Sequence, residues 1–246
     1  MYDPIQDGIA RSVRAVRYTE AKPPEHLSDL VHCYWALWTE TAMDDDFCLH
    51  ALPDACVNIL FNQVDTDIAG VTALRTTHEV LNLGRSFHYA GIELLPGVWQ
   101  GNRHEIADQF VGTPYVGSLP LVATSRDLAQ RDFLAKQDVM STLVQWLIDA
   151  KLVVRNPITA RILANIDRIH SVVDMAAFAC VSPRQLQRTL KDTTGFTPHD
   201  LLKVFRIQQS FKRHYLDLYA DQSHYIHAFR NATGYTPAKY IKTFDV

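Results

Sequence analysis

Two stretches of this sequence repeat each other: RTLKDTTGFTP at residues 188–198 and HAFRNATGYTP at residues 227–237. The offset is 39 residues at every position. In each stretch a helical pattern ends at a glycine, Gly195 or Gly234, and glycine readily takes the positive φ that closes many helices. An aromatic residue follows, and Thr-Pro then has the pattern of a helix cap and first turn. The repeat predicts two similar helical units in the C-terminal part of the chain.

A second helix signal precedes the first copy of the repeat. Ser182-Pro183 has serine at a cap position and proline at the first helical position. The mostly apolar residues 173–178 predict a short helix just before it. In the helix expected from Pro183 to about Thr193, Leu186 and Leu190 are four residues apart and face inward. Two helices joined by a few residues form a helix-turn-helix.

These segments resemble the DNA-binding domain of the AraC/XylS family of bacterial transcription regulators. VDMAAFACVSPRQLQR at residues 173–188 resembles the first helix-turn-helix unit, and QSHYIHAFR at residues 222–230 resembles the second recognition helix. The resemblance implies an all-α domain over residues 157–246 and double-stranded DNA as partner. It implies DNA contacts at Arg184, Gln187, Arg188, Lys191, Gln222, Ser223, His227 and Arg230. Arginine and glutamine suit base edges in the major groove, whereas Lys191 suits phosphate.

The second unit departs from the family pattern. Only 20 residues lie between Pro198 and Tyr219, and one expected helix fills most of them. Family members carry roughly ten more residues here, for a supporting helix and its turn. Position 227 is His, where the repeat aligns it with Arg188, so a positive charge is lost at neutral pH. Either the preceding helix doubles as the supporting helix, or the second unit does not bind DNA.

The front of the chain predicts a β-rich domain over residues 1–122. Apolar and aromatic runs at residues 30–38, 55–62 and 87–95 are bounded by Pro, Gly, Asn and Asp, a pattern typical of an antiparallel sandwich or barrel. Residues 33–35 (CYW), 52–57 (LPDACV) and 95–97 (LPG) resemble a sensor domain found before such helix-turn-helix units. The expected fold is therefore α+β, with a cupin-like β-barrel first.

A barrel interior could hold a small-molecule effector, whose identity the sequence does not give. The aromatic residues that could line a pocket, or equally fill a core, are Tyr34, Trp35, Trp38, Phe61, Phe87, Tyr89 and Trp99. The polar candidates are His50, Asp54, Asn58, His88 and Glu93.

Residues 123–156 predict a helical connector. Ser125 has the position of a cap, and apolar residues recur with helical spacing to about Val153. Asn156-Pro157 breaks that pattern and marks the expected domain boundary. The connector could also serve as the face of a homodimer.

Charge is divided between the two ends of the chain. Residues 155–246 carry 13 basic and 7 acidic side chains, and the remainder carries 11 basic and 20 acidic. A basic end is a candidate for meeting phosphate. No signal-peptide core or membrane-length apolar run occurs, so we expect a cytoplasmic protein. The four cysteines form no CxxC pair and are expected to be small buried residues.

Enzyme motifs are not found in the sequence: it has no HExxH, GxSxG, P-loop or GxGxxG. We therefore expect no enzyme and no cofactor. The function predicted is sequence-specific, ligand-responsive transcription regulation. Two alternatives stay open: a protein-interaction module that has lost DNA binding, and a cupin-type metalloenzyme.

Overall fold

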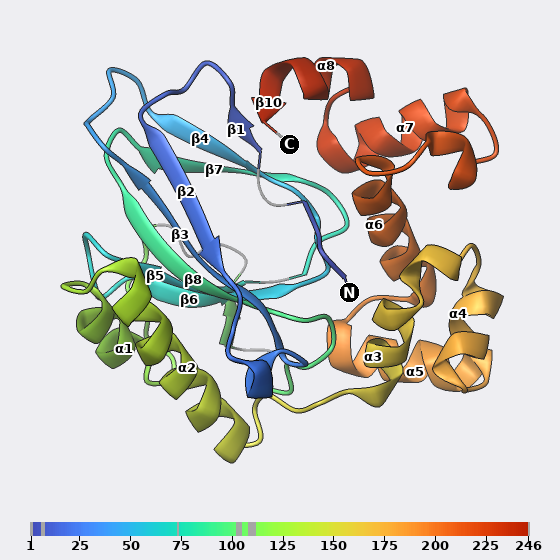
Figure 1. Ribbon diagram of the computed structural model, residues 1–246, viewed down its shortest axis with the longest axis horizontal. Coiled ribbons are helices and arrows are strands. Elements are labelled where there is room, and N and C mark those ends of the chain that lie inside the picture. Colours follow the sequence, from blue (N-terminus) through green and yellow to red (C-terminus); the bar gives the residue numbers. More distant parts are fainter. Residues whose placement is uncertain (1, 6–7, 73, 102–104, 108–111, 246) are drawn as a thin grey trace.

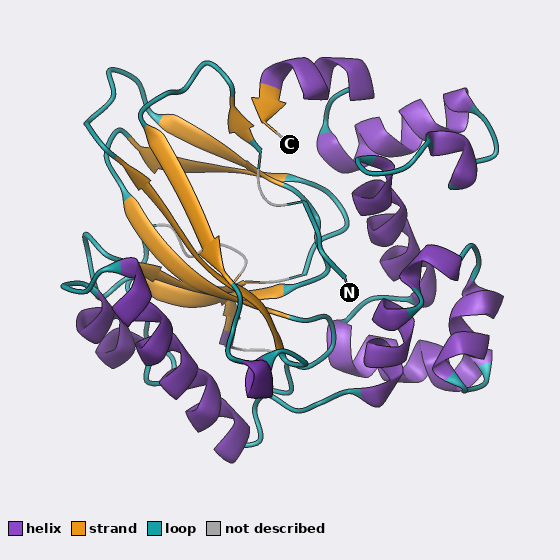
Figure 2. Cartoon of the chain, in the orientation of Figure 1, coloured by secondary structure: helices purple, strands orange, loops and turns teal. Residues whose placement is uncertain are grey.

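The computed structural model describes residues 2–5, 8–72, 74–101, 105–107 and 112–245. Strands dominate the first half of the chain and helices the second (Figure 1, Figure 2). The strands are β1 Ile9–Ala10, β2 Val16–Ala21, β3 Val31–Thr39, β4 Phe47–Ala51, β5 Val57–Asn62, β6 Ala69–Thr72, β7 Glu79–Gly84, β8 His88–Leu94, β9 Ile106–Ala107 and β10 Phe244–Asp245. The α-helices are α1 Leu121–Leu128, α2 Phe133–Asp149, α3 Pro157–Ala164, α4 Val172–Ala179, α5 Pro183–Thr194, α6 Pro198–Ser210, α7 Gln222–Thr233 and α8 Pro237–Thr243.

A six-stranded sheet with strand order β2-β3-β8-β5-β6-β9 forms the centre of the first half. Its pairs are antiparallel except β6 with β9. The strands expected at residues 30–38, 55–62 and 87–95 are confirmed as β3, β5 and β8. They are neighbours in the sheet, with Trp35 opposite Gly91 and Gly91 opposite Leu60.

The predicted closed barrel is wrong. In the part of the chain that the structure describes, the sheet is open: β2 and β9 are its two edges, and they do not pair with each other. β4 and β7 form a separate two-stranded ribbon that faces the sheet without pairing to it. One face of the sheet packs against α1 and α2, which bury Tyr34, Ile59 and Phe61. Helices cover the sheet, so its apolar face is buried without closure.

The helical connector consists of two helices, α1 and α2. Asp132 caps α2, because its side chain accepts from the amide N–H of Ala135. Ser125, the expected cap, instead lies inside α1, where its buried hydroxyl donates to the Asn62 carbonyl. The predicted boundary at Asn156-Pro157 coincides with the start of α3, which Asn156 caps. None of the described helices combines the length and apolarity needed to cross a membrane.

The two halves are joined by backbone pairing as well as by packing. β1, near the N-terminus, pairs antiparallel with β10 at the C-terminus. The side chain of Gln208 on α6 hydrogen-bonds the backbone of Ile5 and the carbonyl of Pro53. Tyr2, Ala55 and Cys56 share a buried cluster with the helices α3 to α6. The strand half therefore makes direct contact with the helical half.

Candidate nucleic-acid interface and the neighbouring cavity

Local sequence signals build the helix pair α4–α5. Ser171 and Ser182 cap the two helices by accepting from the amides of Asp174 and Gln185. The intervening turn is short, Cys180 to Ser182, and Cys180 takes a left-handed conformation with φ 58°. The Arg161 guanidinium donates to the Ala179 carbonyl at the end of α4. These caps fix how the chain leaves α4 and enters α5.

The two faces of α5 differ as the sequence predicts. Leu186 and Leu190 are fully buried. The opposite face carries the predicted DNA contacts, all exposed: Arg184, Gln187, Arg188 and Lys191. Their spacing of three and four residues places them in one row along the helix. The Lys191 ammonium donates to the Gly195 carbonyl at 2.9 Å, so it lies at the C-terminal end of the row.

The 39-residue repeat appears as a repeated hydrogen-bond pattern. At the end of α5, Thr194 Oγ1 donates to the Leu190 carbonyl and accepts from the Phe196 amide. At the end of α7, Thr233 Oγ1 makes the same two bonds, to the Phe229 carbonyl and from the Tyr235 amide. Gly195 and Gly234 have φ of 75° and 77°. The sequence repeat therefore encodes one helix-ending device used twice.

The segment just before α7, residues 211–221, contains no α-helix that could support α7. Residues 211–221 are described throughout and contain one 3-10 turn, η4 Tyr215–Asp217. Aromatic rings fill this place: Tyr225 of α7 stacks on Tyr215 with centroids 5.1 Å apart and lies 5.3 Å from Tyr219. From the other side, Phe211 after α6 packs on Phe229 at 5.4 Å. The end of α6 and a ring stack take the place of the absent helix.

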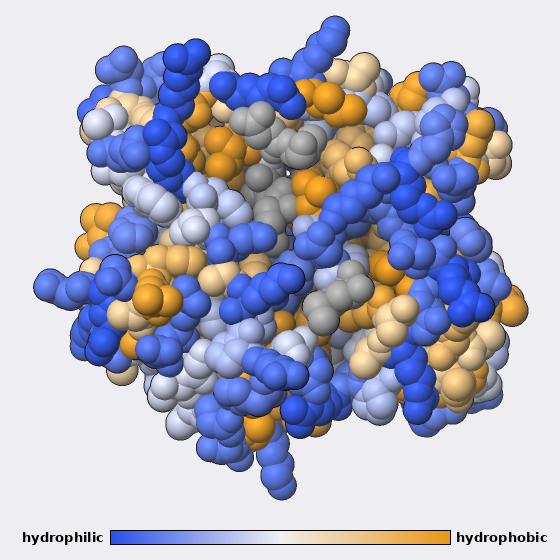
Figure 3. All heavy atoms as spheres, in the orientation of Figure 1, coloured by the Kyte–Doolittle hydropathy of each residue, from blue (hydrophilic) through white to orange (hydrophobic). Residues whose placement is uncertain are grey.

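The exposed face of α7 carries fewer positive charges than that of α5. Gln222, Ser223, His227 and Arg230 are all exposed. Arg230 is the one Lys or Arg in α7, whereas α5 has two arginines and one lysine. The His227 ring nitrogen Nε2 lies 3.0 Å from the Asn231 amide nitrogen, which can donate to it. Hydrophilic side chains cover much of the helical region in the space-filling view (Figure 3).

The C-terminal end of α7 docks on the strand half through two histidines. His50 on β4 is 3% exposed, and its Nε2 donates to the Thr233 carbonyl at 2.8 Å. Its ring stacks on His78 with centroids 4.7 Å apart, and the His78 amide donates to the Ala232 carbonyl. Burial lowers the pKa of His50 to about 4. His50, a candidate ligand group by sequence, is thus part of the contact between the halves.

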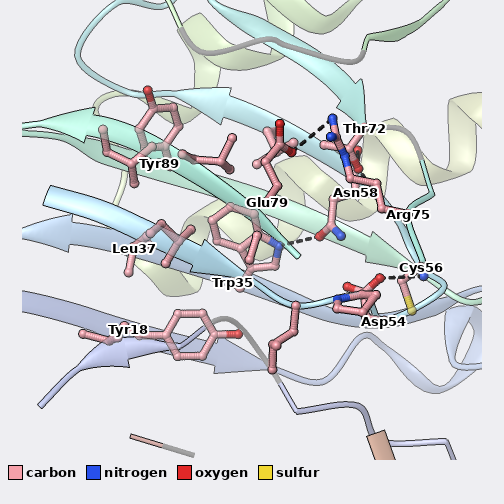
Figure 4. A pocket seen from close by; sticks show the side chains of 18 of the residues that line it. Tyr18, Trp35, Leu37, Asp54, Cys56, Asn58, Thr72, Arg75, Glu79 and Tyr89 are labelled. Atoms are coloured by element: carbon pink, nitrogen blue, oxygen red, sulfur yellow. Dashed lines mark hydrogen bonds and ion pairs between the residues drawn. The ribbon is translucent and has the colours of Figure 1, made fainter. Parts of the chain in front are cut away.

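A cavity lies between the six-stranded sheet and the β4–β7 ribbon (Figure 4). Asp54 and Asn58 line it, as the sequence allowed. Glu93 is fully buried beside it, within 4.8 Å of the ligand atoms of Asp54 and Cys56. His88 is not among its lining residues and packs near Trp38 instead. Sequence reasoning missed Arg75 and Glu79, which line the cavity as an ion pair at 3.1 Å.

The aromatic candidates divide by the face of the sheet on which they lie. Trp35 and Tyr89 line the cavity. Tyr34, Phe61 and Trp99 are core residues in the cluster with α1 and α2. Phe87 is buried in a third cluster against Phe47. Some of these aromatic residues therefore line a pocket and others fill a core, so each of the two sequence interpretations holds for part of the set.

The cysteines also divide. Cys33 and Cys56 are buried, but Cys48 and Cys180 are exposed, so the expectation of four buried cysteines is wrong. Cys180 is exposed because it forms the turn between α4 and α5. Burial raises the pKa of the Cys56 thiol far above its ordinary value and raises the pKa of Asp54 to about 6.

Comparison with known proteins gives one match. Residues 19–111 match a family model described as a domain of unknown function, DUF6597. This domain is commonly found in AraC-type regulators. The match covers most of the sheet and most of the residues that line the cavity, and it ends before α1. No curated protein and no solved structure matches the chain.

Proposed function

We propose that this chain is a sequence-specific DNA-binding transcription regulator of the AraC type, in which α5 reads the major groove. The exposed row of Arg184, Gln187, Arg188 and Lys191 carries the proposal. Its helix is capped at both ends and braced by α4 through fully buried leucines. Such a rigid, cationic and glutamine-bearing face matches the donors that base edges and phosphates require.

α7 is the weaker of the two DNA elements in this proposal. It presents one arginine and two histidines, and aromatic rings support it in place of a helix. Since each neutralised phosphate adds to affinity through counterion release, α7 contributes less than α5. Formation of a homodimer, for which α1 and α2 offer an outer surface, would restore affinity by joining two α5 helices.

DNA-binding anisotropy tests the proposal. The probe is a labelled duplex from the region upstream of the protein's own coding sequence, with an unrelated duplex of equal length as competitor. The double charge reversal Arg184→Glu with Arg188→Glu should lower affinity at least about 30-fold, because each of the two lost arginine contacts costs roughly 1–3 kcal/mol. Arg14→Glu with Arg85→Glu is the matched control, because both arginines are exposed on the strand half.

The control variant has the same net charge and should bind within about threefold of the unmodified protein. Equal losses of duplex affinity in the two variants would mean that net charge alone causes the effect, and would refute a role for α5.

A second candidate function is a protein-interaction module that no longer binds DNA. The missing supporting helix before α7 favours it. Absence of any duplex binding at low salt by the folded, unmodified chain would select this alternative over the regulator.

A further inference from the structure

The cavity between the sheet and the ribbon has the size of a small ring compound. Its volume is about 110 Å³. An engineered apolar cavity of roughly 150 Å³ is known to take up benzene. Leucines line both walls: Leu37 and Leu60 from the sheet, Leu49 and Leu81 from the ribbon. The space here is smaller than that cavity, so its main part suits a branched hydrocarbon chain or at most a single ring.

One end of the cavity is anionic. Asp54 lines it. A carboxylate oxygen of the buried Glu93 lies within 4.8 Å of a carboxylate oxygen of Asp54. Two carboxylates so close in a buried place repel each other unless a proton or a cation lies between them. Arg75 is the basic residue among the described lining residues, and Glu79 already pairs with it at 3.1 Å. This end therefore favours a cationic group over an anionic one.

The backbone of the anionic end is held in an unusual conformation. The Asp54 carboxylate accepts from the Cys56 amide at 2.8 Å, two residues ahead. Between them Ala55 has φ 62°, which is uncommon for a residue with a side chain. The surrounding structure has to stabilise this turn, and strained turns of this kind cluster at ligand sites.

An aromatic wall continues from the anionic end. The Trp35 indole N–H donates to the Asn58 side chain at 3.0 Å, which fixes the ring beside the cavity (Figure 4). Gly91 on the neighbouring strand makes room for it, because a Cβ there would lie 2.4 Å from the indole carbons. Tyr18 and Tyr89 line the same space. Indole and phenol faces attract ammonium groups.

We propose that this cavity binds a small organic cation, with its ammonium group at Asp54 and its apolar body between the leucines and the Trp35 indole. A divalent metal ion would use only the oxygen and sulfur atoms of Asp54, Cys56 and Glu93 and would leave the apolar space unexplained. The inference rests on the proposed regulator function and adds to it a class of small-molecule effector. Its test needs no DNA, so its failure would leave the role of α5 untouched.

Calorimetric titration of the full chain with three probes of nearly equal size tests this inference. The probes are benzylammonium, benzyl alcohol and benzoate. Benzylammonium should bind at least about tenfold more tightly than benzyl alcohol, and benzoate should not bind, since only the first pairs its charge with Asp54. Asp54→Asn keeps the shape of the side chain and should remove that preference while leaving benzyl alcohol unchanged.

Two further variants are matched to this one. Asp67→Asn removes an exposed carboxylate, which pairs with Arg126 on the far side of the sheet, and should change nothing. Ala51→Phe keeps Asp54 but fills the cavity from β4, and should abolish binding of benzylammonium and benzyl alcohol alike. Equal affinity for the charged and neutral probes, or an unchanged preference in Asp54→Asn, would overturn the proposal. So would stoichiometric Zn²⁺ binding lost in Asp54→Asn, with no response to benzylammonium.

Discussion

Tyr225 replaces part of a missing helix, and its truncation measures how much α7 depends on the ring stack. Its ring lies 5.1 Å from Tyr215, 5.3 Å from Tyr219 and 5.7 Å from Phe229. Truncating a fully buried aromatic residue costs about 3–5 kcal/mol. Tyr225 is half-buried, so roughly half of that is expected, with about 0.5–1 kcal/mol more from the stacked pair. Tyr225→Ala should therefore lower the free energy of unfolding by about 2–3.5 kcal/mol.

Urea unfolding followed by circular dichroism measures this loss. A double-mutant cycle with Tyr215→Ala should give a coupling of about 0.5–1.5 kcal/mol, because the two rings stack directly. Leu216→Ala is the control, because Leu216 lies beside Tyr215 in η4 but is 54% exposed. This substitution should lower the free energy of unfolding by no more than about 0.5 kcal/mol. A Tyr225→Ala cost as small as that of the control, or zero coupling, would refute the view that the rings support α7.

Three further changes have defined outcomes. His50→Gln should reduce acid sensitivity: the pKa of His50 is about 4 in the folded chain and ~6.5 when unfolded, so the unfolded state takes the proton first. Stability is then lost as pH falls from about 6.5 to 4, and between pH 7 and pH 5 the unmodified protein should lose about 1–2 kcal/mol more than His50→Gln. The raised pKa of Asp54 acts in the opposite sense but cancels in this difference, since both proteins contain it. Gly91→Ala should displace the Trp35 indole, seen as a shift in tryptophan fluorescence, with loss of benzylammonium binding; an unshifted spectrum would contradict the close packing. Ser182→Ala should cost about 1 kcal/mol in urea unfolding through loss of the α5 cap, and a neutral result would mean that the cap does not hold α5.

The helical half was predictable because its signals are local. Ser182-Pro183 and the two Thr-Gly-aromatic-Thr-Pro stretches each specify a cap or a turn within a few residues. The position of α7 was not predictable, since it depends on ring contacts between Tyr215, Tyr219 and Tyr225 that no periodicity reveals.

The apolar runs predicted the strands β3, β5 and β8. They did not predict which face of the sheet each residue occupies. Strands buried on both faces lose the alternation that would reveal it. For the same reason His50 and Asp54 could not be told apart as candidates. Long-range pairing places His50 against α7 and Asp54 in the cavity. The prediction of a barrel was wrong because pairing between the two edge strands depends on the twist of the sheet and on the helices that cover it.

The salt dependence of duplex binding tests the central claim most directly. If Arg184, Arg188 and Lys191 of one chain each neutralise about one phosphate as α5 enters the groove, the slope of log affinity against log salt concentration should be about −3 per chain. The reversal of both arginines should flatten it by about 2 units, and Arg230→Glu on α7 by less than 1. A slope unchanged by the α5 reversal, or no measurable binding near 50 mM salt, would contradict the account.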